Sequence, residues 1–227
     1  MAMQLEQVVP FGRSLDEYTQ MFALTQADFQ RSILSVADGP ASFNAEGVAL
    51  GYQIQSVDPL YTFNTTEIKS RFYDVLEDVI AQVASTPNDW SWTYHASPEA
   101  LKTHRIKVTE TFCADYETGR AQGRYTVGEL PSLSYADDAC ELGLCSHFLF
   151  LYSEQRDCEF HLAAIDEMLR VCQEVRIFPL LTLGLERSSH LPKVLAHLEN
   201  AGHTHNIETV PYEFQKGGNE MLRIYRT

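Results

Sequence analysis

The stretch from Ile33 to Pro59, ILSVADGPASFNAEGVALGYQIQSVDP, constrains the fold more than any other part of the chain. Two short runs of apolar and β-branched residues flank a helical pattern that ends at a glycine. This alternation predicts a βαβ unit with parallel strands. We expect a strand over 33–36, a helix over 40–50 and a second strand over 52–57, within an α/β fold.

The turn after the first expected strand and the end of the second carry residues suited to a ligand. Gly39 would let backbone approach a ligand closely, and Pro40 suits a first helical turn whose N–H groups are unpaired. Asp58 stands about nineteen residues further on, where a carboxylate accepts hydrogen bonds from a ribose diol. The fragment is compatible with a site for a nucleoside-bearing cofactor and equally with an ordinary α/β turn.

Composition narrows the class of protein. The 227 residues suffice for one domain, and no apolar run approaches the length of a membrane span. A formal net charge of -14 argues against nucleic acid or an anionic membrane as a partner. The N-terminus lacks a signal-peptide pattern and the cysteines are odd in number, so we expect a cytoplasmic protein with reduced thiols.

Helical signals occur on both sides of the βαβ unit. Ser14 with Glu17, and Thr25 with Asp28, are capping patterns that predict two short helices within residues 14–32.

Residues 61–122 exceed what a simple crossover needs and predict a helical insertion or lid. Apolar spacing in EIKSRFYDVLEDVIAQVA indicates a helix capped by Thr65 or Thr66, and a further helix is expected from Ser97.

The linker between these two helices, TPNDWSWTYHAS, concentrates aromatic residues. Trp90, Trp92 and Tyr94 either line a substrate pocket or anchor the lid to the body, and anchoring is the commoner role of such a cluster.

The segment after the insertion, RYTVGELPSLSYADDACELGLCSHFLFLY, resembles the middle of a class I S-adenosylmethionine-dependent methyltransferase. The expected third strand over 124–127, the loop at 130–138 and the fourth strand over 141–145 follow the family's order. EFHLAAIDEMLRVCQEVRIFPLL and HNIETVPYEFQKGGNEMLRIYR resemble its next helix and strand and its final hairpin. The resemblance implies one domain over 1–227 with a Rossmann-like, seven-stranded, mostly parallel sheet and an antiparallel C-terminal hairpin.

The resemblance also implies a site for S-adenosyl-L-methionine. Asp58 would hold the ribose, Arg13 would pair with the cofactor carboxylate, and His147 would flank the sulfonium. The full set of implied cofactor-binding residues is Arg13, Ala37, Asp38, Gly39, Asp58, Pro59, Leu60, Gly128, Glu129, Leu130, Ser146 and His147. Two alternatives stay open, because Arg13 fits an exposed arginine equally well and Asp38 fits a helix cap.

Methyl transfer from a sulfonium depends largely on positioning, so a general base is not obligatory. Where the acceptor needs one, His147 is the candidate, because imidazole titrates near neutral pH; its alternative is a pocket-edge or core histidine. The acceptor is expected to be a small molecule, neutral or cationic. No cysteine or histidine spacing indicates a metal site.

The glycine-rich turn of the family is degenerate here. In one register Ser35 and Ala37 occupy glycine positions, and in a register shifted by two residues Ala37 and Ala41 do. An alanine tolerates this turn only where φ is negative. The alternative function is therefore a non-catalytic methyltransferase-like protein with weakened or lost cofactor binding, acting as a sensor or protein-interaction module.

Overall fold

The computed structural model describes residues 9–227 and contains a seven-stranded sheet in the order β3-β2-β1-β4-β5-β7-β6. The strands are β1 (Ile33–Val36), β2 (Ile54–Val57), β3 (Tyr125–Thr126), β4 (Cys140–Ser146), β5 (Cys172–Phe178), β6 (Thr204–Thr209) and β7 (Glu220–Tyr225). Strands β1 to β5 pair in parallel, and β7 is antiparallel to both of its neighbours. The predicted mostly parallel sheet with an antiparallel C-terminal hairpin is confirmed.

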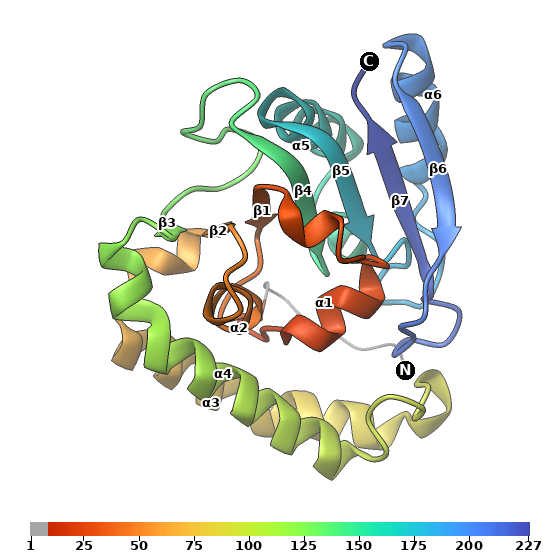
Figure 1. Cartoon of the computed structure of the whole chain (residues 1–227). Coiled ribbons are helices and arrows are strands. Elements are labelled where there is room, and N and C mark those ends of the chain that lie inside the picture. Colours follow the sequence, from red (N-terminus) through yellow and green to blue (C-terminus); the bar gives the residue numbers. More distant parts are fainter. Residues whose placement is uncertain (1–8) are drawn as a thin grey trace.

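Helices cover both faces of the sheet (Figure 1). They are α1 (Leu15–Met21), α2 (Phe43–Ala49), α3 (Thr65–Ser85), α4 (Pro98–Ala121), α5 (Cys158–Val171) and α6 (Leu191–Asn200), with short 3-10 helices η1 (Asp28–Gln30), η2 (Pro59–Thr62), η3 (Pro87–Asp89) and η4 (Phe150–Tyr152).

Side-chain alternation along β1 assigns the two faces. Leu34 and Val36 lie in the core that packs under α5 and α6, whereas Ile33 lies in the core under α1 and α2. All four β1 residues are buried, as expected for a central parallel strand covered on both sides.

Helices α3 and α4 form a long antiparallel hairpin below the sheet, at the end where β4 and β5 terminate (Figure 1). The apolar stripe of α3 is buried as its spacing predicts, and Ser97 caps α4. The predicted caps of α3 are wrong: Asn64 accepts from the N–H of Glu67, and both threonines lie inside the helix.

Two other local expectations need correction. The helix predicted from Pro40 begins at Phe43, with Ser42 at its N-cap. The backbone at Pro40 instead packs against Gly12, where a Cβ would lie 2.1 Å from the Pro40 carbonyl oxygen. The capping pattern of Thr25 and Asp28 forms its hydrogen bonds, but only the single 3-10 turn η1 follows it.

Candidate functional site

A cavity of about 780 Å³ lies where β1, β2 and β4 end and extends along α3. In open α/β sheets, ligands bind at the carboxyl ends of the parallel strands, next to the point where the strand order reverses. The cavity is large enough for a drug-sized ligand. The loops after these three strands line it together with α3, the segment before α1, and side chains that include Arg105 of α4 and Phe214.

The turn after β1 has left-handed backbone. Gly39 has φ 54° and nothing within 4 Å of the place where a Cβ would be, so the backbone is open to the cavity. Ala37 has φ 57°, a conformation that costs an L-residue roughly 1–2 kcal/mol. The sequence predicts that an alanine is tolerated in this turn only at negative φ, and the φ of Ala37 is positive.

Asp58 directly follows β2, and its carboxylate accepts hydrogen bonds from nearby backbone N–H groups. Its two carboxylate oxygens accept from the N–H of Gly39 at 2.9 Å and from the N–H of Leu60 at 2.7 Å. Burial raises the pKa of Asp58 to about 6, against the opposing effect of these two hydrogen bonds.

Asp38 lies beneath the same turn and does not cap α2. Its carboxylate accepts from the hydroxyl of Tyr61 at 2.8 Å and from that of Ser56 at 2.9 Å. Burial, followed by the charge of Asp58, raises the pKa of Asp38 to about 7. Two buried carboxyl groups with displaced pKa values therefore adjoin the cavity.

Arg13 lines the cavity and is not the exposed arginine of the alternative interpretation. Its guanidinium donates to the carbonyls of Phe11 at 2.5 Å and Gly12 at 3.3 Å, while its Nε has no hydrogen-bond partner among residues 9–227. Burial and the neighbouring Arg105 lower the pKa of Arg13. Its ion pair within residues 9–227 is the 3.9 Å approach of Nε to Glu17, a carboxylate that Arg105 already engages, so this partly buried cation favours an anionic ligand group.

His147 follows β4 with φ 52°, and its N–H donates to the carbonyl of Phe178 at 2.6 Å. Its Nδ1 lies 2.9 Å from the hydroxyl of Ser146, and both residues line the cavity. Burial, together with the charges of Arg13 and Arg105, holds the pKa of His147 well below its usual value. The imidazole is therefore neutral near pH 7.

The structure separates some of the predicted residues. Gly128, Glu129 and Leu130 line a second, smaller cavity of about 40 Å³ rather than the large one. Ala37, Asp58 and Pro59 line both cavities, whereas Arg13, Asp38, Gly39, Leu60, Ser146 and His147 line the large cavity alone.

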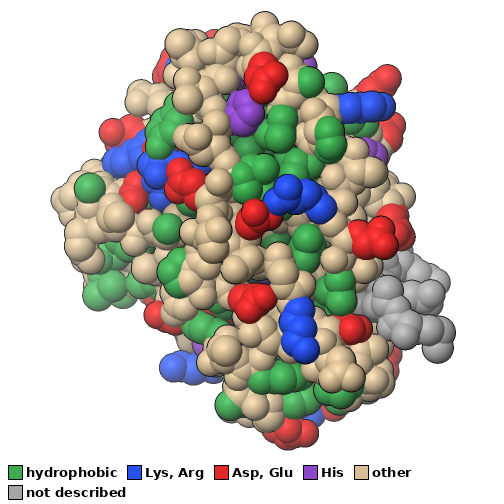
Figure 2. Space-filling view, turned by 90° about the vertical axis from the view of Figure 1, so that its right-hand side faces the viewer, with side chains coloured by type: hydrophobic (Ala, Val, Ile, Leu, Met, Phe, Trp, Pro, Cys, Tyr) green, Lys and Arg blue, Asp and Glu red, His purple; other side chains and the backbone are tan. Residues whose placement is uncertain are grey.

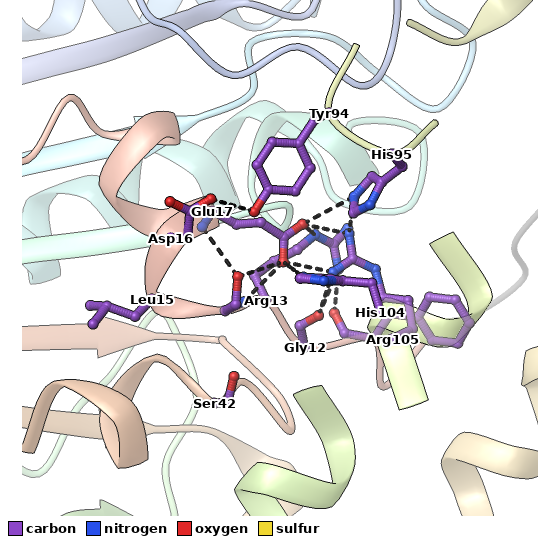
Figure 3. A network of polar contacts seen from close by, with 12 residues as sticks. Gly12, Arg13, Leu15, Asp16, Glu17, Ser42, Tyr94, His95, His104 and Arg105 are labelled. Atoms are coloured by element: carbon purple, nitrogen blue, oxygen red, sulfur yellow. Dashed lines mark hydrogen bonds and ion pairs between the residues drawn. The ribbon is translucent and has the colours of Figure 1, made fainter. Parts of the chain in front are cut away.

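A buried polar cluster joins the α3–α4 hairpin to α1, and no local sequence pattern indicates it (Figure 3). Glu17 accepts two hydrogen bonds from Arg105 of α4, at 2.8 and 2.6 Å, and its carboxylate also meets His104 at 3.1 Å and Tyr212 at 3.0 Å. Burial acts to raise the pKa of Glu17, but Arg105 and the histidines hold it well below its usual value.

Glu17 was predicted only as a capping-box residue of α1, a role it also performs. No local pattern could have paired it with a residue 88 positions away.

The aromatic linker divides between the two roles left open for it. Trp90 lines the cavity and stacks on Phe214 at 4.7 Å. Trp92 meets the edge of Phe214, and Tyr94 donates to Asp16 of α1 at 2.6 Å, so these two residues anchor the linker to the body.

Metal-binding clusters and membrane-spanning helices were both sought in the part of the chain that the structure describes. Within residues 9–227 no group of three or more His, Cys, Asp or Glu side chains is arranged to hold a metal ion. Among the same residues, no helix has both the length and the apolar character required to cross a membrane.

Comparisons with known proteins place these features in context. No family model matches the chain. Among solved structures, mitomycin 7-O-methyltransferase MmcR is 14% identical with a TM-score of 0.48, covering 94% of this chain and 54% of that one. Magnesium protoporphyrin IX methyltransferase (ChlM) of Synechocystis PCC 6803, with bound SAM, is 9% identical with a TM-score of 0.45, covering 93% and 90%.

The uncharacterized protein MJ0045 of Methanocaldococcus jannaschii is 36% identical over 225 residues, which cover 99% of each chain. The chain belongs to the same family as MJ0045, and its sheet has the strand order and directions of the Rossmann-like class I methyltransferase fold.

Proposed function

We propose that this protein is an S-adenosyl-L-methionine-dependent methyltransferase that acts on a small molecule. One observation carries the proposal: a single cavity gathers the turn after β1, Asp58 at the end of β2, Arg13, and His147 at the end of β4. These segments lie far apart in the sequence, and the resemblance assigns all of them to one cofactor.

The donor end of the cavity fits the polar groups of this cofactor. Asp58 keeps free lone pairs beyond its two backbone hydrogen bonds, so it is able to accept from a ribose diol. Arg13 supplies a cation for the carboxylate, and Pro59 and Leu60 offer apolar surface for the adenine.

The chemistry needs placement more than proton transfer. Bound S-adenosylmethionine supplies a methyl group activated by a sulfonium, and the protein holds donor and acceptor in line. His147, neutral and half-buried at the cavity wall, would accept the proton of an acceptor hydroxyl. Its lowered pKa makes it a weak base, so positioning carries most of the rate.

A small-molecule acceptor agrees with the charge of the protein. On the face shown in Figure 2, Lys and Arg side chains are interspersed with Asp and Glu side chains. The net charge of -14 opposes binding of a polyanion. A cytoplasmic location is part of the proposal, supported by five cysteines that form no disulfide among residues 9–227.

The second candidate, a non-catalytic protein of the same fold, is favoured by Ala37. Its methyl group stands in a turn with φ 57°, at a place where the family usually has glycine. Weakened cofactor binding is the expected consequence.

Thermal unfolding in the presence of S-adenosylmethionine or S-adenosylhomocysteine tests the choice, with NAD as the control ligand. A ligand at a hundred times its dissociation constant adds about 2.7 kcal/mol to the free energy of unfolding, a shift of a few degrees in the midpoint. A saturable shift with both adenosyl ligands and none with NAD supports the enzyme. No shift at millimolar ligand supports the non-catalytic candidate.

A further inference from the structure

The large cavity follows α3 over several helical turns. The residues of α3 that line it run from Arg71 to Val83, about 18 Å at the rise of an α-helix. The guanidinium of Arg71 lies over the ring of Phe63, which caps η2 shortly after Asp58, so this end of the cavity adjoins the residues assigned to the nucleoside. Val83 marks the opposite end, which the cofactor assignment leaves unexplained.

Apolar side chains from separate segments form this opposite end. Val83 of α3, Trp90 of the linker and Leu101 of α4 pack in one buried cluster, and each of them lines the cavity. Phe214 also lines the cavity, and its ring stacks on Trp90 with the centroids 4.7 Å apart. Val79, one turn before Val83, continues the wall along α3. We call the part of the cavity lined by these five residues the far end.

The aromatic wall of the far end is fixed in place. The indole N–H of Trp90 donates to the hydroxyl of Thr86 at 3.0 Å, and the N–H of Ser91 donates to the carbonyl of Phe214 at 2.7 Å. Because the polar group of Trp90 is already engaged, its ring offers apolar surface to a ligand. A preformed wall also reduces the ordering cost of binding.

The loop after β5 connects the far end to the segment that carries His147. The amide of Gln215, whose backbone bridges to Trp90, donates to the carbonyl of Thr182 at 2.9 Å. The N–H of the next residue, Leu183, donates to the carbonyl of Leu151 at 3.1 Å. Leu151 and His147 belong to the same segment after β4, and both line the cavity with Leu183. A molecule at the far end therefore extends toward His147.

The charged residues that the cofactor assignment leaves over are solvated or paired. Arg71, Asp74 and Asp78 are exposed, so they lie where the cavity meets solvent. Arg105 is buried, but its guanidinium donates two hydrogen bonds to Glu17. The five residues of the far end are uncharged, so a charged ligand group would lose its hydration there without gaining an ion partner. The far end therefore favours an uncharged molecule.

We propose that the far end is the acceptor subsite and that it takes a phenol, with the aromatic body against Trp90 and Phe214 and the hydroxyl at His147. This inference rests on the proposed function, because it assigns the remainder of the same cavity. An imidazole that is a weak base removes a proton most readily from an acidic hydroxyl, and a phenol ionises near pH 10, as the side chain of tyrosine does.

The transfer balances with the groups named. The phenol oxygen forms a bond to the methyl carbon, and the carbon–sulfur bond breaks with its electron pair on sulfur. His147 takes the phenol proton and later returns it to solvent. The products are a methyl ether and the neutral thioether S-adenosylhomocysteine.

Four probes of similar shape test the preference: 2-naphthol, decahydro-2-naphthol, 2-naphthoate and 2-(aminomethyl)naphthalene. Their dissociation constants for the full chain are measured by ligand-observed NMR, with and without saturating S-adenosylhomocysteine. We expect 2-naphthol to bind at least about tenfold more tightly than either charged probe, because it buries no charge. With S-adenosylmethionine present, 2-naphthol should be converted to 2-methoxynaphthalene, whereas the saturated alcohol should not react.

Substitutions locate the subsite. Val79→Phe adds a ring to the wall of the far end, and it should weaken 2-naphthol binding by about tenfold or more because the ring fills the space. Ala81→Phe is the matched control, since it adds the same ring at an exposed position of α3 that does not line the cavity. Its affinity for 2-naphthol should stay unchanged.

A second pair of variants tests the aromatic contact. Trp90→Leu removes the ring that lines the cavity and should weaken 2-naphthol binding by about tenfold, the upper range for one aromatic contact. Trp92→Leu removes the other tryptophan of the linker, which meets the edge of Phe214 without lining the cavity, and should leave binding unchanged.

Equal or tighter binding of a charged probe, absence of binding by all four probes, or full 2-naphthol affinity in Val79→Phe would overturn the proposal. A loss of S-adenosylhomocysteine affinity in Val79→Phe but not in Ala81→Phe would also overturn it, because the far end would then hold the cofactor. Binding of 2-naphthol without methylation, in a protein that binds S-adenosylhomocysteine, would refute the phenol as acceptor. If S-adenosylhomocysteine fails to bind the unmodified protein, the proposed function fails; the probe affinities measured without it still decide whether the far end takes an uncharged aromatic molecule.

Discussion

The N–H of Gly39 donates a 2.9 Å hydrogen bond to Oδ2 of Asp58, which joins the turn after β1 to the end of β2. The other carboxylate oxygen fixes the start of η2 through the N–H of Leu60. The residue assigned to the ribose therefore also shapes the turn that would hold the rest of the cofactor, so ligand affinity and local structure depend on one carboxylate.

Asp58→Ala should abolish stabilisation by S-adenosylhomocysteine and lower the free energy of unfolding by about 1–2 kcal/mol, because a helix cap is also lost. Thermal unfolding with and without ligand measures both. Asp157→Ala is the control, since Asp157 caps α5 through the N–H of Phe160 and does not line the cavity. An unchanged ligand response in Asp58→Ala would refute the ribose assignment.

Ala37→Gly should relieve the left-handed strain and raise S-adenosylhomocysteine affinity. The stability gain is limited to about 1 kcal/mol, because glycine also gives the unfolded chain more freedom. Ala23→Gly is the matched control, with φ 45° at a position that does not line the cavity. We expect the two substitutions to give similar gains in the free energy of unfolding. Only Ala37→Gly should raise the affinity for S-adenosylhomocysteine, which calorimetric titration measures. Equal affinities in all three proteins would show that the alanine does not hinder binding.

The contribution of Asp38 and Asp58 to stability should fall as pH rises from about 4 to about 7, whereas histidines with a lowered pKa, such as His147, act in the opposite direction. The folded pKa values of Asp38 and Asp58, about 7 and about 6, lie above the usual carboxyl value, so the folded state binds more protons across this window. Affinity for S-adenosylhomocysteine should rise over the upper part of the window, because the ionised Asp58 accepts ribose hydrogen bonds. Urea unfolding of the unmodified protein and of Asp38→Asn at several pH values isolates the contribution of Asp38: the stability of the unmodified protein relative to the variant should fall as pH rises. A relative stability that rises over this window would contradict the raised pKa of Asp38.

Arg13→Met should weaken S-adenosylhomocysteine binding by about 10- to 100-fold, the usual worth of a charged hydrogen bond. Methylthioadenosine lacks the amino-acid carboxylate, so its affinity should change less than threefold in the same variant. Isothermal titration of both ligands against both proteins gives the comparison. Equal losses for the two ligands would place the role of Arg13 elsewhere.

Glu17→Gln should destabilise the protein by about 3–5 kcal/mol, because Arg105 would be left as a buried, unpaired cation. Adding Arg105→Met should restore part of the loss, since both charges are then absent. Urea unfolding of the two variants measures the coupling. Additive losses in the double variant would show that the two residues do not act as a pair.

The sequence by itself determined individual elements: the apolar runs of β1 and β4 and the helical periodicity of α3 are local patterns, and each predicts its own element. The sheet that these elements form was implied by the resemblance to class I methyltransferases, and the strand order confirms it. Asp58 and Gly39 were likewise found by their spacing within one βαβ unit.

Only the tertiary structure decided what surrounds the cavity. In the structure Arg105 of α4 donates to Glu17 of α1, and Asp74 and Asp78 of α3 line the large cavity. Gly128 lines the smaller cavity instead. These relationships join residues distant in the chain, and they depend on how the α3–α4 hairpin packs on the body. A sequence pattern records which face of a helix is apolar, but the partner of a buried charge is fixed only when all packed elements are in place.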